Sequence, residues 1–185
     1  MQEIEILLEL QESFEMALAK LSGFKFIGLK QTIDIYYYDP LREDLKLNAA
    51  GKLMACCRLR EKAGKYFLTY KTDHYKGDQW LYSDEYETEI SDHEAAKSII
   101  SHLGLKELVT INSAKHIFET EKYEIVLENV DNLGGFLEVE YKGSSEDVTD
   151  IKDDIMTFIN SLDIRVGREL NSGKPELLLN KQAIT

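Results

Sequence analysis

Strict alternation of charged and apolar residues is the feature that most limits how this chain can fold. In Glu3-Ile4-Glu5-Ile6 the two glutamates fall on one side of an extended strand, and in Arg58-Leu59-Arg60 the two arginines do the same. Because side chains alternate between the two faces of a strand, each such segment has one ionic face and one apolar face. The same spacing recurs in later segments: Glu85, Glu87 and Glu89; Ser113, Lys115 and Ile117; Glu124 and Glu128; and Glu138 and Glu140.

Three stretches between these strands have helical spacing instead, and Pro175 begins a short terminal turn. The first covers about 11–22, and the third begins near Glu146. The second follows Ser91, which we expect to form a capping box with Glu94, and it ends at Gly104. The residues expected to face the core are Phe14, Leu18 and Leu21 in the first, Ala95, Ile99 and Leu103 in the second, and Val148, Ile151, Ile155, Phe158 and Leu162 in the third. Helices between groups of strands favour an α+β fold with an antiparallel sheet.

Two arrangements of six or more such strands satisfy the alternation. An open sheet leaves the ionic face in water, and the alternation taken alone favours this arrangement. A closed barrel lays the apolar faces against the helices and turns the ionic faces around a hydrated cavity. In either case the 185 residues, with only two prolines, predict a single domain over 1–185.

The charge balance limits the partners. Against 34 Asp and Glu there are 22 Lys and Arg, a net charge of −12, so we expect no basic surface for duplex nucleic acid or for a membrane. The first ten residues carry acids where a signal peptide carries Lys or Arg, and no apolar run is long enough to span a bilayer. With Cys56 and Cys57 adjacent, a stapling disulfide is disfavoured, and we expect a cytoplasmic protein.

The two signs of charge suit two ligands. Hard divalent cations such as Mg²⁺ or Mn²⁺ prefer carboxylate oxygens, and two glutamates two residues apart on one strand can both reach the same ion. Guanidinium and ammonium groups hold phosphate oxygens, and Arg58, Arg60, Lys71 and Lys115 are the candidates. Together these carboxylates and cationic side chains favour a site for a metal and a polyphosphate.

A series of motifs in fixed order makes this more specific. The motifs are Glu3-Ile4-Glu5-Ile6-Leu7; Gln31-Thr32-Ile33-Asp34-Ile35-Tyr36-Tyr37; Arg58-Leu59-Arg60-Glu61 with Thr69-Tyr70-Lys71; Glu85-Tyr86-Glu87-Thr88-Glu89; Leu103-Gly104; Ser113-Ala114-Lys115; and Glu128 with Glu138-Val139-Glu140. The series spans most of the chain. It resembles the triphosphate tunnel metalloenzymes, or CYTH superfamily, and is most similar to their class IV adenylyl cyclase branch.

The resemblance implies an antiparallel eight-stranded β-barrel, or tunnel, with flanking helices. It implies Mg²⁺ or Mn²⁺ held by Glu3, Glu5, Glu128, Glu138 and Glu140, with Glu87 and Glu89 as further candidates, and a triphosphate such as ATP held by Arg58, Arg60, Lys71 and Lys115. The implied activity is conversion of ATP to cyclic AMP and pyrophosphate by a monomer or homodimer. The alternatives are a triphosphatase acting on inorganic, thiamine or nucleoside triphosphate, and a binding module without turnover.

The departures from the family pattern fall mainly on cations. Leu7 and Ser113 stand where the family has lysines, Lys115 stands for an arginine, and Glu128 stands for an aspartate. A charge-assisted hydrogen bond contributes roughly 1.5–3 kcal/mol, so two missing lysines predict weaker triphosphate binding unless other cations replace them.

Overall fold

The computed structural model describes residues 2–143 and 147–184, which form ten strands and four helices. The strands are β1 (Gln2–Glu3), β2 (Glu5–Leu10), β3 (Lys25–Tyr38), β4 (Ala55–Lys62), β5 (Lys65–Lys76), β6 (Gln79–Ile90), β7 (Lys106–Glu119), β8 (Tyr123–Val130), β9 (Gly134–Tyr141) and β10 (Val166–Glu169). The helices are α1 (Phe14–Lys20), α2 (His93–His102), α3 (Val148–Ser161) and α4 (Lys174–Ile184). The expected start of the third helix near Glu146 lies outside the described residues.

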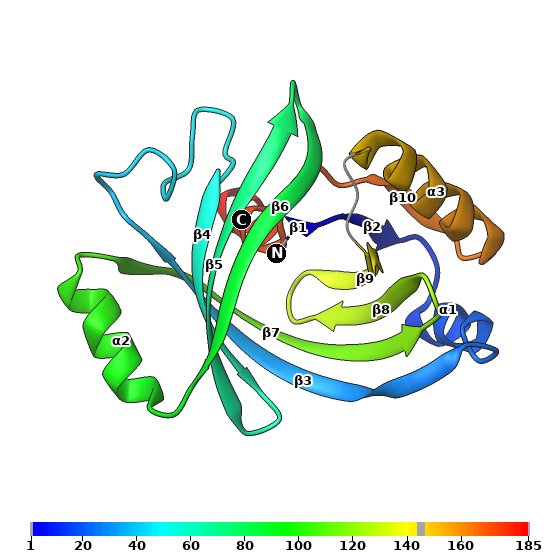
Figure 1. Ribbon diagram of the computed structural model, residues 1–185, viewed down its shortest axis with the longest axis horizontal. Helices are drawn as coiled ribbons and strands as arrows, with labels where there is room; N and C mark the ends of the chain where they lie inside the picture. The colour runs from blue at the N-terminus through cyan, green and yellow to red at the C-terminus, as the bar shows by residue number, and fades with distance from the viewer. Residues whose placement is uncertain (1, 144–146, 185) are drawn as a thin grey trace.

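The strands form one curled antiparallel sheet in the order β1-β6-β5-β4-β3-β7-β8-β9-β2-β10. The N-terminal segment joins both ends of this order, because Gln2 and Glu3 pair with β6 while residues 5–9 pair with β9. Figure 1 shows the strands curving around a central opening. The expected antiparallel barrel with flanking helices is therefore confirmed. The described residues form ten strands instead of the expected eight, because Ile4 divides the first strand and β10 adds a short strand beside β2.

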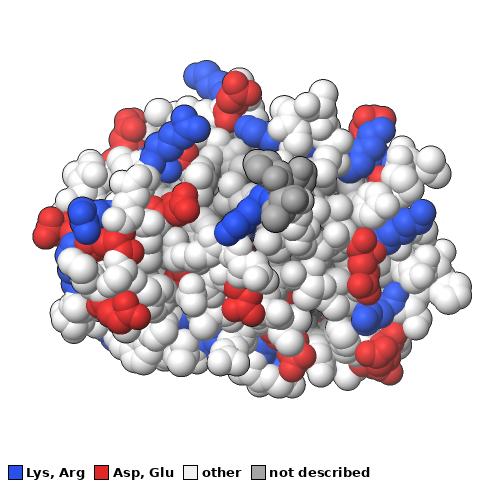
Figure 2. Space-filling view, turned by 180° about the vertical axis from the view of Figure 1, so that it is seen from behind, with Lys and Arg blue, Asp and Glu red and all other residues white. Residues whose placement is uncertain are grey.

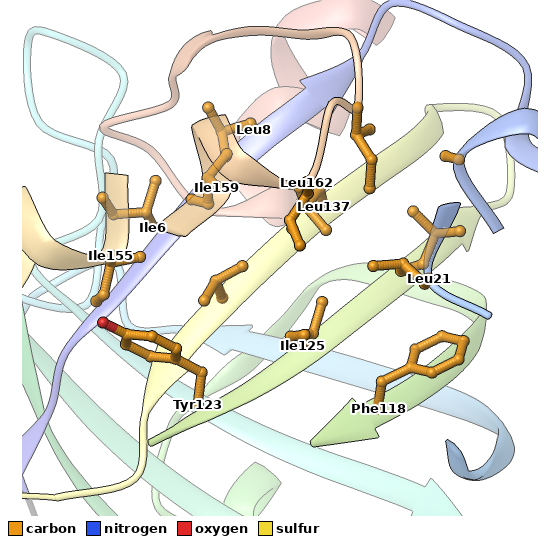
Figure 3. Close-up of a cluster of buried hydrophobic side chains, with 14 of the residues drawn as sticks. Ile6, Leu8, Leu21, Phe118, Tyr123, Ile125, Leu137, Ile155, Ile159 and Leu162 are labelled. Carbon is orange, nitrogen blue, oxygen red and sulfur yellow. The ribbon is translucent and has the colours of Figure 1, made fainter. Parts of the chain in front are cut away.

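The main hydrophobic core lies on the outer face of β2, β8 and β9, beneath α1 and α3 (Figures 1 and 3). Ile6, Leu137 and Ile155 are each at most 1% exposed in this cluster. Full burial of one such side chain stabilises the fold by roughly 1.5–3 kcal/mol. This burial energy determines which face of each strand is turned toward the helices, because a register shift of one residue would turn the apolar side chains away from them.

Helix α2 also lies on the outer face of the sheet, but across the molecule from α1 and α3, where it packs against β4 (Figure 1). The expected capping box at Ser91 is wrong, since Asp92 is the N-cap and its side chain accepts the backbone N–H of Ala95 at 2.9 Å. The expected core residues are wrong as well, because Ile99 is 60% exposed and Leu103 71%, while Ile100 is buried. The helix contacts the sheet through a stripe one residue out of phase with the expected one.

Helix α4 covers one end of the cavity inside the sheet. Leu178 packs there against Leu7, Tyr36 and Phe136, and the helix continues for 11 residues where the sequence predicted only a turn. In Figure 1 this helix, in red, lies behind the N-terminal strand.

The outer surface carries both signs of charge. On the face seen in Figure 2, acidic and basic side chains of the described residues are interspersed. Within the described ranges, no helix is long and apolar enough to cross a membrane.

Candidate functional site

The curled sheet encloses a cavity that is lined largely by ionic side chains. It contains about 830 Å³ of unfilled space, counting the solvent at its openings. Because inward and outward side chains alternate, Glu5 and Leu7 line the cavity while Ile6 and Leu8 face the core outside it. The predicted site residues that line it are Glu3, Glu5, Arg58, Arg60, Lys71, Lys115, Glu128 and Glu138.

Carboxylates gather on the wall formed by β1, β2, β8 and β9. In the strand register Glu5 lies opposite Glu140, and Leu7 lies opposite Glu138. Burial raises the pKa of Glu5 to about 7, a rise that Lys71 opposes and Glu3 increases. Burial also raises the pKa of Glu140 to about 9, with further contributions from Glu3 and Glu5. Buried carboxylates this close together favour the proton-bound form unless a cation lies between them.

Arginines occupy the wall opposite, on β4, which is separated from β9 by β3, β7 and β8 in one direction and by β5, β6 and the segment β1–β2 in the other. Arg60 donates two hydrogen bonds to Asp34, each 2.7 Å long. Burial favours the protonated form of Asp34, but Arg60 outweighs this and brings its pKa down to about 2. Arg58 donates from Nη2 to the Thr69 hydroxyl at 3.2 Å. Its buried Nε has no hydrogen-bond partner among the described residues, which marks a place for an acceptor.

Lys115, on β7, adds a third cation between the two walls and lies opposite Glu128 in the strand register. Its Nζ lies 3.7 Å from Glu128, too far for a hydrogen bond. Burial lowers the pKa of Lys115; Glu128 opposes this effect, whereas Lys174 and Arg60 add to it. An anion near Nζ would relieve this crowding of positive charge. Ser113, which stands for a family lysine, lies with its hydroxyl 2.9 Å from that of Thr32.

Two other lysines lie among the carboxylates themselves. Lys71 pairs with Glu3 and with Glu5, at 2.9 Å from the latter, and its Nζ lies 5.1 Å from the centre of the Trp80 ring. Lys174, the first residue of α4, pairs with Glu128 and with Glu138. The structure thus places Lys71 beside the predicted metal ligands Glu3 and Glu5, and Glu85 lies between it and Arg58, at 4.0 Å from Lys71 and 3.7 Å from Arg58.

The remaining predicted acids lie toward the mouth or outside. Glu87 and Glu140 line a second hollow at the mouth together with Glu3. Glu89 is not brought to the site, because its carboxylate pairs with Lys65 at 2.8 Å and is 52% exposed. Glu89 lies close to the end of β6, in a groove against α2, and we therefore remove it from the candidate ligands.

Several residues of the site had no predicted role. Asp34 and Tyr36 line the cavity, and alternation within their strand could have placed them there. Lys174 and Glu176 also line the cavity, although they come from α4. No sequence pattern indicates that this helix reaches the inside of the sheet.

The chemistry of the lining fits a divalent cation. Oxygen ligands from Glu3, Glu5 and Glu138 are the type that Mg²⁺ and Mn²⁺ prefer, and burial, with neighbouring carboxylates adding to it, raises the pKa of Glu5 and of Glu140, an effect that a bound cation would offset. Among the described residues, no group of three Asp, Glu, His or Cys side chains lies close enough together to hold a metal ion in this conformation. The ammonium groups of Lys71 and Lys174 lie between them instead.

Comparisons with solved structures agree with this architecture. The protein PH1819 of Pyrococcus horikoshii OT3 is similar with a TM-score of 0.81 and 24% identity, over 97% of this chain and 99% of that one. HpAC1 of Hippeastrum, provisionally named an adenylyl cyclase and described as having a dominant triphosphatase activity, is similar with a TM-score of 0.67 and 15% identity, over 97% and 95%. At these identities the likeness concerns the fold.

Sequence comparisons extend the likeness to the family. The protein MJ0240 of Methanocaldococcus jannaschii, provisionally named an adenylate cyclase, is 32% identical over 166 residues, which are 88% of this chain and 90% of that protein. The CYTH domain model matches residues 1–169. The ordered motifs, the curled sheet with its ionic cavity and these matches lead to one assignment: the chain belongs to the CYTH domain family.

Proposed function

We propose that this protein is a metal-dependent enzyme that acts on a triphosphate. Proteins of the CYTH superfamily are in general metal-dependent and bind triphosphates. The observation that carries the proposal for this chain is the division of one cavity into a carboxylate wall and, across from it, a wall with Arg58 and Arg60.

Each wall has a defined part in binding. Glu3, Glu5, Glu128, Glu138 and Glu140 would hold Mg²⁺ or Mn²⁺. The metal supplies positive charge beside the phosphates and activates the attacking oxygen. Arg58 offers its unpartnered Nε, and Lys115 its ammonium, to phosphate oxygens. Arg60 is held in place by Asp34 and lines the same cavity, where its guanidinium would contact the same ligand.

The first specific form of the proposal is a class IV adenylyl cyclase. In that reaction the ribose 3′ hydroxyl of ATP attacks the α-phosphorus, and pyrophosphate leaves. The name of MJ0240, 32% identical over most of both chains, supports this form. The cavity walls would hold the triphosphate extended between them, which positions the α-phosphorus for the attack.

A triphosphatase is the second candidate. The description of HpAC1, a structure with the same fold, names a dominant triphosphatase activity, so water can be the attacking group in this architecture. The absence of lysines at Leu7 and Ser113 supports a third outcome, a protein that binds triphosphate without turnover.

One experiment separates the three. The purified protein is incubated with ATP, tripolyphosphate or thiamine triphosphate and either Mg²⁺ or Mn²⁺, and cyclic AMP, pyrophosphate and phosphate are measured. Cyclic AMP with pyrophosphate supports the cyclase, phosphate release supports the triphosphatase, and saturable binding without product supports the module. If none of these compounds binds, the proposal is wrong.

Two glutamate variants, one in the cavity and one away from it, provide the test and its matched control. Glu138→Gln removes a carboxylate from the cavity wall, whereas Glu89→Gln removes one that lies beyond the enclosed part of the sheet. Only the first should lower metal-dependent activity.

A further inference from the structure

The site contains a cation from outside the family domain. The CYTH match ends at residue 169, but Gly173, Lys174, Pro175 and Glu176 line the same cavity as the strand carboxylates. Of these four, Lys174 carries the only positive charge. The C-terminal segment therefore supplies a charged group to the centre of a site that the domain otherwise builds from strands.

Lys174 lies where two proposed metal ligands meet. Its Nζ pairs with Glu128 and lies 2.6 Å from the carboxylate of Glu138. The Lys174 side chain is 11% exposed and that of Glu128 is 2% exposed. A divalent ion that bound this carboxylate pair would need the space that the ammonium group now fills, so the two cations compete for the same oxygen atoms.

Lys174 also lies close to the place of the lysine that Leu7 replaces. Leu7 stands where the family pattern has a lysine, and it lies opposite Glu138 in the strand register. Leu7 and Lys174 both line the cavity. The positive charge that the first strand lacks is therefore delivered to its neighbour Glu138 from α4.

The attachment of α4 leaves the side chain free to move without the helix. Asn171 accepts the backbone N–H of Trp80 at 2.8 Å, Glu176 accepts that of Leu53 at 3.1 Å, and Lys181 donates to the carbonyl of Asn132 at 2.8 Å. These contacts hold the backbone on both sides of Lys174. A lysine has a flexible four-carbon stem, so its ammonium can shift while the helix remains in place.

We propose that Lys174 is a triphosphate-binding residue that is paired with Glu128 and Glu138 only while no metal is bound. When a divalent metal binds these two carboxylates, the ammonium group turns to the phosphate oxygens and takes the part of the lysine absent at position 7. This inference rests on the proposed function, because it needs both ligands to enter the cavity.

The test measures two affinities of Lys174→Met, which keeps the length of the side chain and removes its charge. Calorimetric titration with Mn²⁺ alone should show binding about tenfold tighter or more than in the unaltered protein, because the competing ammonium is gone. Titration with diimidotriphosphate, which resists hydrolysis, at saturating Mn²⁺ should show binding about tenfold weaker or more. Opposite changes are the expected signature, since damage to packing alone would weaken both.

Two further variants control the result. Lys65→Met makes the same change outside the cavity, at an exposed lysine that pairs with Glu89, and should leave both affinities unchanged. Adding Leu7→Lys to Lys174→Met places a cation on the first strand and should recover part of the affinity for diimidotriphosphate.

The unaltered protein gives an independent measurement if Lys174→Met does not fold. Acylation of Lys174 by an amine-reactive reagent, followed by peptide mass spectrometry, should become faster when Mn²⁺ alone is added, because the ammonium group leaves its carboxylate partners, and should slow again when diimidotriphosphate follows. Unchanged acylation in both steps, or equal affinities of Lys174→Met and unaltered protein, would overturn the role of Lys174 and leave the proposed function standing. If the unaltered protein binds neither Mn²⁺ nor diimidotriphosphate, both proposals are wrong.

Discussion

The two halves of the curled sheet differ in how their outer faces are covered. Behind β2, β8 and β9, which carry the carboxylates, Ile6 and Leu137 are at most 1% exposed beneath α1 and α3. Behind β3 to β6, which carry the arginines, Leu29 is 54% exposed and Tyr86 67%. The carboxylate wall is therefore packed from behind, whereas the arginine wall is partly bare.

The difference matches the tolerance of the two proposed ligands. A metal site requires ligand distances within about 0.2 Å of their preferred values, so its carboxylates need a backbone that does not move. Long cationic side chains can follow phosphate oxygens through small shifts of the strand, because their stems have several rotatable bonds. We infer that the helices are placed where positional accuracy is most needed.

The largest expected effect is on stability, from a cavity made in the packed half. Leu137→Ala removes a side chain that is 0% exposed between β9 and the helices, and it should lower the free energy of unfolding by about 3–5 kcal/mol. Leu59→Ala, behind the arginine wall, should cost about 2–3 kcal/mol because its surroundings can collapse around the gap. Urea unfolding measures both, and an equal or larger loss for Leu59→Ala would contradict the comparison.

The second prediction concerns metal binding. Glu138→Gln combined with Glu140→Gln removes two proposed ligands from the packed wall, and Mn²⁺ affinity should fall by about 100-fold or more. Isothermal titration measures the change. Glu89→Gln is the matched control and should bind Mn²⁺ like the unaltered protein; unchanged affinity in the double variant would remove Glu138 and Glu140 from the ligand set.

A smaller effect is expected on the arginine wall. Arg60→Lys loses the paired hydrogen bonds to Asp34 and the planar fork, so triphosphate affinity should fall by about tenfold. Mn²⁺ affinity should stay the same, because Arg60 lies across the cavity from the proposed ligands. A parallel loss of both affinities would show that the two walls do not act separately.

The smallest effect is a dependence of stability on pH in metal-free protein. The pKa of Glu5 is about 7 and that of Glu140 about 9, both above the ordinary 4.5. Between pH 5 and 9 the folded state therefore binds more protons than the unfolded chain, and the free energy of unfolding falls as pH rises. We expect a decrease of at least about 1 kcal/mol in urea unfolding with a chelator present.

Two additions sharpen this pH profile. Glu140→Gln should flatten it, because the group that must give up its proton is gone. Mn²⁺ should stabilise the protein more at pH 8 than at pH 5, since proton and metal compete for the same oxygens. A profile that does not change with Glu140→Gln would show that this carboxylate is solvated and not buried beside Glu3 and Glu5.

Alternation made most of the site predictable. Glu5, Arg58 and Glu138 had to point to one side of their strands, and the apolar residues between them determined which side faces the helices. Closure of the sheet did not follow from alternation, which taken alone favours an open sheet; closure was predicted from the ordered motifs. The stripe through which helix α2 contacts the sheet was predicted one residue out of phase. The predicted stripe, with Ala95, Ile99 and Leu103, and the observed stripe, with Ile100, are both apolar, so the pattern does not distinguish them.

The position of Lys174 could not be predicted, because it depends on where α4 docks. Nothing within residues 170–184 indicates that Leu178 packs beside Leu7 and Phe136, and only that contact carries Lys174 into the cavity. The prediction of Glu89 as a metal ligand fails for a related reason. Glu89 continues the row of Glu85 and Glu87, but its strand extends beyond the enclosed part of the sheet.

The N-terminal strand that joins both ends of the sheet has a consequence for biosynthesis. Residues 2–9 leave the ribosome well before the strands they pair with, since Glu3 pairs with Ser83 and Glu5 with Glu140. The ring of strands cannot close before residue 140 has emerged, and until then an apolar strand edge stays without its partner. Such long-range pairing is slow and exposes aggregation-prone surface, so this strand, made before both of its partner strands, is among the last to be paired.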